Sequence, residues 1–173
     1  AIDGNRFPKL NYSIFQKALW APFPNKPGVA LQSSWNLSGI QNVDAWSNCP
    51  TVELFLNGVS KGVRKPDAEA RCTWAGIAWE SGTLKVAGLD ASGKPVCSDE
   101  RRTAGPPQRI ILTVEPSLVK PDGKRFHITA NGSDAAIVTA TIVDAEGNWC
   151  PDANNNIRFS VSGPGNYRGS YNF

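Results

Sequence analysis

The sequence predicts an all-β protein made of two tandem β-sandwiches, and two observations carry this prediction. From residue 29 onward, apolar and polar residues alternate in short runs, and turn-forming residues separate the runs at the roughly 8–12-residue spacing typical of sandwiches. The 16 Gly and 13 Pro residues make up about 17% of the 173 positions, below the roughly 25–30% of disordered chains. Folded, immunoglobulin-like β-sandwiches fit both observations.

One helix is predicted, in the N-terminal segment 1–21. After Pro8, apolar residues fall at helical spacing, and Pro22 and Pro24 end the pattern. These apolar residues are Leu10, Ile14, Phe15, Ala18 and Leu19. A single short amphipathic helix is marginal in water, so it needs a partner surface.

The first sandwich is predicted over 22–104. Residues 52–56 alternate as a half-buried strand does, and Asn57-Gly58 closes the run with a hairpin turn. Upstream, 43–46 alternates in the same way before the turn residues 47–50. We therefore expect the 52–56 strand to have one antiparallel neighbour across each of these two turns.

The same sandwich continues with a second predicted hairpin. The apolar residues of 84–87 run into the turn residues 90–93, and 95–103 returns as the partner strand. The segment Thr103-Ala104-Gly105-Pro106-Pro107 then breaks the pattern, because adjacent prolines favour extended backbone and remove hydrogen-bond donors. We place the domain boundary at this break.

The second sandwich is predicted over 105–173 and is expected to be truncated. Its predicted strands are 109–114, 136–143 and 157–161. The unit has only 173 − 104 = 69 residues, whereas an immunoglobulin-like sandwich takes about 100. The chain also contains no Met and starts at Ala1. We therefore expect it to be a piece of a longer protein.

Charge and hydropathy argue against two classes of partner. The 18 basic residues exceed the 15 acidic ones by only +3, and they are scattered, so no stripe for a nucleic-acid backbone is predicted. No apolar run reaches the roughly 18–20 residues that a membrane helix needs. Neither nucleic acid nor a membrane is expected as a partner.

No catalytic residue, metal site or cofactor is predicted. The acidic residues are single and are read as turn-capping groups rather than a catalytic pair; they are Asp44, Asp67, Asp90, Asp122, Asp134, Asp144 and Asp152. The single histidine, His127, lies in the strand-like run 125–129 and has no second His to share a metal. The run 152–156 offers oxygen ligands for Ca²⁺, but it is better read as an Asn-rich loop.

The pairing of the four cysteines stays open. They show no C-x-x-C spacing, which argues against zinc and thioredoxin-type chemistry; they are Cys49, Cys72, Cys97 and Cys150. Free buried thiols and a disulfide are both compatible with the sequence. Outside the cytoplasm, one bond within 22–104 is the expected arrangement, with Cys150 left single.

Six tryptophans raise the question of carbohydrate binding, because an exposed aromatic face can stack on a sugar ring. Trp46 and Trp79 are the candidates for carbohydrate contact. Trp46 lies on the strand face opposite Val43 and Ala45. Packing of tryptophan in the core or between domains is the favoured alternative, because sandwiches commonly bury it.

Several motifs carry a family resemblance. Residues 47–62 read SNCPTVELFLNGVSKG, similar to the SNCDxVELFLNGxSLG signature of a domain that follows the catalytic barrel in β-galactosidase-like members of glycoside hydrolase family 2. Trp35-Asn36 resembles the preceding HWNW, with Ser34 in place of His. Further similar segments are 82–88 (GTLKVAG), 103–107 (TAGPP), 143–148 (VDAEGN) and 157–165 (IRFSVSGPG), and 7–12 (FPKLNY) resembles the PKxxYY opening of the last barrel helix.

The resemblance implies a non-catalytic C-terminal accessory region of such an enzyme, with the catalytic barrel as its partner. The catalytic glutamates of the family lie in that barrel, and no position here matches their motifs. The resemblance also implies an exported bacterial protein, periplasmic or secreted. Two alternatives stay open: a carbohydrate-binding module that uses exposed tryptophan, and a surface interaction or adhesion domain.

Overall fold

The computed structural model describes residues 26–32, 34–114 and 135–170, and every regular element in these ranges is a β-strand. This confirms the all-β class. The predicted helix in 1–21 and the predicted strand around His127 lie outside the described residues. In the described part of the chain, no helix is long and apolar enough to cross a membrane.

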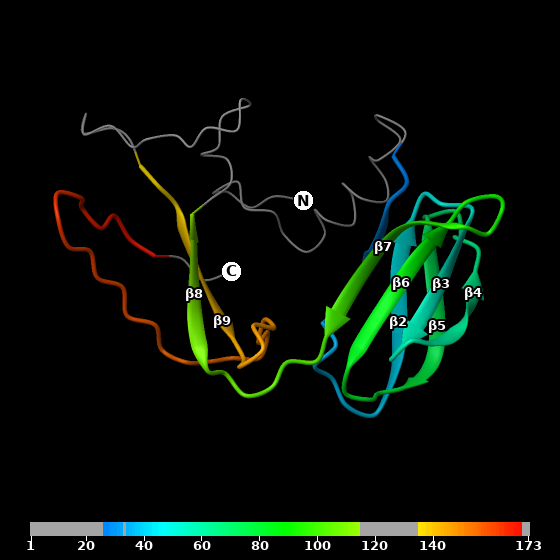
Figure 1. Ribbon diagram of the computed structural model, residues 1–173, viewed down its shortest axis with the longest axis horizontal. Helices are drawn as coiled ribbons and strands as arrows, with labels where there is room; N and C mark the ends of the chain where they lie inside the picture. The colour runs from blue at the N-terminus through cyan, green and yellow to red at the C-terminus, as the bar shows by residue number, and fades with distance from the viewer. Residues whose placement is uncertain (1–25, 33, 115–134, 171–173) are drawn as a thin grey trace.

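The first seven strands form a two-layer antiparallel sandwich, here called the first sandwich (Figure 1). They are β1 (Val29–Leu31), β2 (Ile40–Ser47), β3 (Thr51–Leu56), β4 (Val59–Arg64), β5 (Arg71–Ala78), β6 (Thr83–Leu89) and β7 (Pro95–Arg102). One sheet has the order β1-β2-β5 and the other β4-β3-β6-β7. Seven short antiparallel strands in two sheets are the immunoglobulin-like arrangement that the sequence predicts.

The core lies between the two sheets and is built by alternation. On β3, Val52, Leu54 and Leu56 are buried, and the residues between them are half-buried. Trp35 and Trp74 are the largest side chains of the core, each at most 2% exposed. The remaining core members include Val29, Leu31, Val43, Ala45, Cys72, Leu84 and Val86.

Both predicted hairpins are confirmed. Asn57 and Gly58 join β3 to β4 with φ angles of 52° and 81°, the two left-handed positions that a type I′ turn requires. Between β6 and β7, the Asp90 carboxylate accepts hydrogen bonds from the backbone N–H groups of Ser92 at 2.8 Å and Lys94 at 2.9 Å. Local turn chemistry thus sets both registers.

The segment 47–50 does not join two strands of one sheet, and the expectation that it would is wrong. β2 pairs with β1 and β5, whereas β3 pairs with β4 and β6. The Ser47 hydroxyl donates to the Gly28 carbonyl at 2.7 Å, and the Asn48 side-chain oxygen accepts from the Gly28 N–H at 2.7 Å. These bonds hold the segment against the chain before β1, so it crosses between the sheets.

The second unit contains the antiparallel pair β8 (Arg109–Val114) and β9 (Val138–Val143), paired over all six positions. Both strands were predicted. The predicted strand at 157–161 is wrong, because this segment has no strand partner in the described residues and is largely exposed. In Figure 1 it runs away from the β8–β9 pair as an extended loop.

A matched pair of substitutions tests the sandwich core. Val52 on β3 is fully buried, whereas Val59 on the paired strand β4 is 61% exposed. We expect Val52→Ala to lower the free energy of unfolding by about 2 kcal/mol or more, through lost burial and a cavity. Val59→Ala should change it by less than about 0.5 kcal/mol. Urea unfolding measures both, and equal effects would contradict the assigned core.

Candidate functional site at the joint between the two units

The linker between the two units is held by hydrogen bonds from both sides, and we call this region the joint. The Thr103 hydroxyl donates to the Trp35 carbonyl at 3.0 Å, and the Ala104 N–H donates to the Asn36 side chain at 2.8 Å. The next residue, Gly105, donates its N–H to the Asp144 carboxylate at 2.8 Å. Successive residues of the linker are therefore fixed first to the first sandwich and then to the second unit.

Asp144 is the buried acceptor of the joint, only 1% exposed. Besides Gly105, it accepts from the Asn148 N–H at 2.7 Å and from the Asn148 side-chain amide at 3.0 Å. Burial opposes ionisation of this carboxyl, but the bonds from Gly105, Asn148 and the Glu146 backbone outweigh it and lower its pKa from 3.8 to about 2. The carboxylate therefore stays ionised and acts as an anchor.

A cleft of about 260 Å³ lies beside the joint. The first sandwich contributes 34–36 and 100–102, and the second unit contributes Asn148, Trp149 and Pro151. Both units are needed to form it.

The cleft combines an aromatic surface with polar groups. Trp149 is 58% exposed, so its indole is available to a ligand or a partner protein. Arg102 and Glu100 form an exposed ion pair, with 3.0 Å between the guanidinium and carboxylate atoms. Such a combination can hold a small polar molecule with an apolar face.

The two tryptophans singled out from the sequence lie elsewhere and do not form one surface. Trp46 is half-buried in β2, opposite Arg71 of β5. Trp79, just beyond β5 at the other end of this ladder, is half-buried against the core and donates its indole N–H to the Trp35 carbonyl at 3.3 Å. Their role in carbohydrate contact stays a prediction.

Trp149 was not singled out from the sequence, because it follows the turn at 144–148 and forms only a single β-bridge, to Val143, so it belongs to no run of alternating residues. Among the tryptophans that the structure describes, it is the one classed as exposed. Its position directly after the 143–148 motif is the sequence signal that could have identified it.

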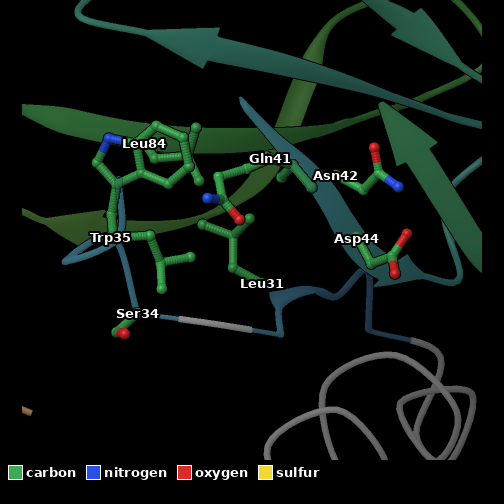
Figure 2. Close-up of a pocket in the computed structure, with 9 residues that line it drawn as sticks. Leu31, Ser34, Trp35, Gln41, Asn42, Asp44 and Leu84 are labelled. Atoms are coloured by element: carbon green, nitrogen blue, oxygen red, sulfur yellow. The ribbon is translucent and has the colours of Figure 1, made fainter. Parts of the chain in front are cut away.

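A second hollow, beside Trp35 in the first sandwich, is too small for a sugar. Its volume is about 10 Å³, close to what one water molecule needs. Figure 2 shows Trp35 packed beside Leu84 and Leu31, which fill the space. We therefore regard the cleft at the joint as the candidate site.

Three described acidic residues cap turns, as predicted. Asp67 accepts from the Arg71 N–H at 2.8 Å, and Asp90 and Asp144 accept from their own turns. Hydrogen bonding to Arg71 lowers the pKa of Asp67, and hydrogen bonding led by Ser92 lowers that of Asp90. Each carboxyl is thereby kept ionised, the opposite of what a general acid needs.

The turn-capping prediction is wrong for Asp44. It lies inside β2, where it accepts a hydrogen bond from the Thr73 hydroxyl across the sheet. Asp152 lies at a turn, whereas Asp122 and Asp134 lie outside the described residues. Within 26–32, 34–114 and 135–170, no group of three or more His, Cys, Asp or Glu side chains could hold a metal ion.

The joint is tested by Asp144→Asn. One carboxylate oxygen accepts from Asn148 N–H, and the other accepts from Gly105 and from the Asn148 amide. An amide NH₂ in either position faces a donor, so at least one of these bonds is lost. We expect limited proteolysis within 103–108 to become several-fold faster.

Asp90→Asn is the matched control, because Asp90 caps a similar turn but does not touch the linker. It should leave linker proteolysis unchanged.

The low folded-state pKa of Asp144 stabilises the native state above about pH 4, and this contribution is lost as the pH falls from about 4 to about 2. The Tm difference between the wild type and Asp144→Asn should shrink in that window; a constant difference would contradict the assignment.

Comparisons with known proteins agree with this architecture. Residues 39–97 match a family described as a domain of unknown function, DUF4982, and residues 120–173 match the family described as glycoside hydrolase family 2 C-terminal domain 5. The beta-galactosidase BoGH2A of Bacteroides ovatus is 36% identical over 95% of this chain, and a beta-glucuronidase of Formosa agariphila is 33% identical over 99%.

Solved structures match both units. A beta-glucuronidase from glycoside hydrolase family 2 aligns with a TM-score of 0.74 and 30% identity over 88% of this chain and 15% of its own. A beta-glycosidase from Bacteroides vulgatus aligns with a TM-score of 0.70 and 27% identity over 87% of this chain and 18% of its own. The chain spans 18% and 16% of the lengths of the two curated relatives. Residues 120–173 therefore match a C-terminal domain of glycoside hydrolase family 2, and nearly the whole chain is similar to a small part of longer glycosidases.

Proposed function

We propose that this chain is the non-catalytic accessory region of a β-galactosidase-like glycoside hydrolase and packs against its catalytic barrel. One observation carries the proposal. Nearly the whole chain aligns with 15–18% of much longer glycosidases, and its 120–173 segment matches a family described as a C-terminal domain. In this role the chain contributes structure, and the reaction takes place in another part of the enzyme.

The exposed apolar surface of the second unit supports a packing role. All six residues of β8 are exposed, including Ile110 at 47%, Leu112 at 66% and Val114 at 56%. A two-stranded ladder is only marginally stable alone, and apolar surface of this kind gains free energy when protein covers it. The catalytic barrel is the partner that we propose for this face.

The first test is enzymatic. We expect the isolated chain to release no p-nitrophenol from p-nitrophenyl β-galactoside or p-nitrophenyl β-glucuronide, and the longer enzyme that carries it to hydrolyse one of them. Hydrolysis by the isolated chain that a single Asp or Glu substitution abolishes would overturn the proposal.

The packing role has its own measurement. Leu112→Glu should leave the Tm of the isolated chain within about 2 °C and lower the Tm of the longer enzyme, because only there does the barrel cover this face. Val59→Glu, on the exposed side of β4, is the control and should change neither Tm. Equal Tm values for Leu112→Glu and wild-type enzyme would contradict packing at β8.

The cleft at the joint favours a second candidate function, carbohydrate binding. Its support is the 58% exposed indole of Trp149 next to the Arg102–Glu100 ion pair. An aromatic face can cover the C–H face of a pyranose, while charged and amide groups hydrogen-bond its hydroxyls. In this role the accessory region would hold part of a glycan chain outside the active site.

Tryptophan fluorescence during titration with galactose, glucuronic acid and β-galacto-oligosaccharides tests this second candidate. We expect Trp149→Ala to weaken binding at least about tenfold, the loss of an aromatic anchor worth more than about 1.4 kcal/mol. Trp46→Ala and Trp79→Ala should bind as the wild type does. A loss confined to either of these two variants would move the site to the residues predicted from the sequence, and silence across the panel would remove this function.

A further inference from the structure

Two of the four cysteines meet in the first sandwich. The sulfur atoms of Cys49 and Cys97 are 3.6 Å apart, although the residues are 48 positions apart in the chain. Cys49 lies between β2 and β3, and Cys97 lies in the edge strand β7. A disulfide has an S–S distance of about 2.05 Å. Side-chain rotation that brings the two sulfurs about 1.5 Å closer together would therefore allow the bond to form.

Gly88 makes room for both sulfurs. It pairs with Cys97 in the β6–β7 ladder, and a Cβ atom added to it would lie 2.6 Å from each of the two sulfurs. Such a separation is far inside van der Waals contact. Its backbone is not left-handed, so the requirement for glycine here is one of space. The two sulfurs thus pack side by side in the space that the missing side chain of Gly88 leaves over β6.

The segment that carries Cys49 is also held in place. The Cys49 N–H donates to the Ser47 hydroxyl oxygen at 3.0 Å, and that hydroxyl donates to the Gly28 carbonyl. On the other side, the β6–β7 ladder fixes Cys97. Little further ordering is therefore needed to bring the sulfurs together.

The other two cysteines have different neighbours. Cys72 lies in the core with its sulfur 3.9 Å from the Arg64 carbonyl, and Cys150 lies at the joint with its sulfur 3.5 Å from the Gly105 carbonyl. Of the pairings that the sequence left open, the structure supports only Cys49 with Cys97.

We propose that Cys49 and Cys97 form a disulfide when the chain folds in an oxidising compartment such as the bacterial periplasm. In this step each thiol loses its proton, and together they transfer two electrons to the disulfide of an oxidant such as oxidised glutathione. One S–S bond forms between the cysteines, one breaks in the oxidant, and two thiols leave.

Burial in the folded sandwich makes the Cys97 thiol a poor nucleophile. In the folded state, burial first and the neighbouring Cys49 second raise the pKa of Cys97 to about 12, so almost no thiolate is present at neutral pH. The thiolate is the species that attacks an oxidant disulfide. The Cys97 thiol therefore attacks an oxidant more readily before the sandwich has folded around it.

The test is to unfold the chain, reduce it and refold it in a mixture of oxidised and reduced glutathione, followed by alkylation and non-reducing peptide mapping. We expect one linked peptide pair containing Cys49 and Cys97, with Cys72 and Cys150 alkylated. The bond would close a loop between two cysteines that are 48 positions apart, and this should raise the Tm by roughly 10–20 °C over the reduced chain. Four alkylated cysteines, or a bond to Cys72 or Cys150, would overturn the proposal.

Two variants serve as controls. Cys97→Ser should lose the Tm difference between oxidised and reduced protein. Cys150→Ser should keep it, because a hydroxyl can donate to the same Gly105 carbonyl. The peptide map of the unchanged chain does not depend on either variant folding.

Chain exported to a bacterial periplasm should carry the bond, and chain kept in the cytosol should not. The same thiol state in both compartments would contradict the proposal.

Discussion

Trp35 is the residue on which the first sandwich and the joint both depend. Its ring is buried in the core, and its indole N–H donates to the Glu80 carbonyl at 2.9 Å, just before β6. Its own carbonyl accepts from Trp79 at 3.3 Å and from the Thr103 hydroxyl at 3.0 Å. One residue therefore connects the hydrophobic core, the end of β5 and the start of the linker. Removing its ring would empty core volume and lose the bond to Glu80, whereas the linker is held by the backbone carbonyl of the same residue.

The sequence predicted those parts of the fold that local chemistry determines. Asn57-Gly58 and Asp90 set their hairpins through their own backbone angles and hydrogen bonds, so no distant residue was needed. The segment 47–50 has similar turn residues, but its path depends on Gly28, about twenty positions away. The segment 157–161 has strand-like periodicity, yet a strand exists only where a partner ladder does. Non-local partners account for both errors.

The candidate site shows the same limit. The turn at 144–148 was predicted from its composition, but the bond from Gly105 that makes Asp144 an anchor crosses 39 positions. Trp149 has no periodic neighbour that would reveal its exposure. The two tryptophans chosen from the sequence lie on or beside strands, where the ladder and the core half-bury them. Exposure of an aromatic residue depends on which segments pack beside it, and periodicity does not report this.

The motifs of the family resemblance have a common physical meaning in the structure. Asn36 belongs to the motif at 35–36, and Ala104 and Gly105 belong to the motif at 103–107. Asp144 begins the turn of the motif at 143–148. These segments are distant in sequence, and in space they form the joint. A hydrogen-bonded joint fixes direction as well as distance, because each backbone N–H must point at its acceptor. The motifs therefore encode how the second unit is oriented relative to the first, and that orientation brings Trp149 to the cleft.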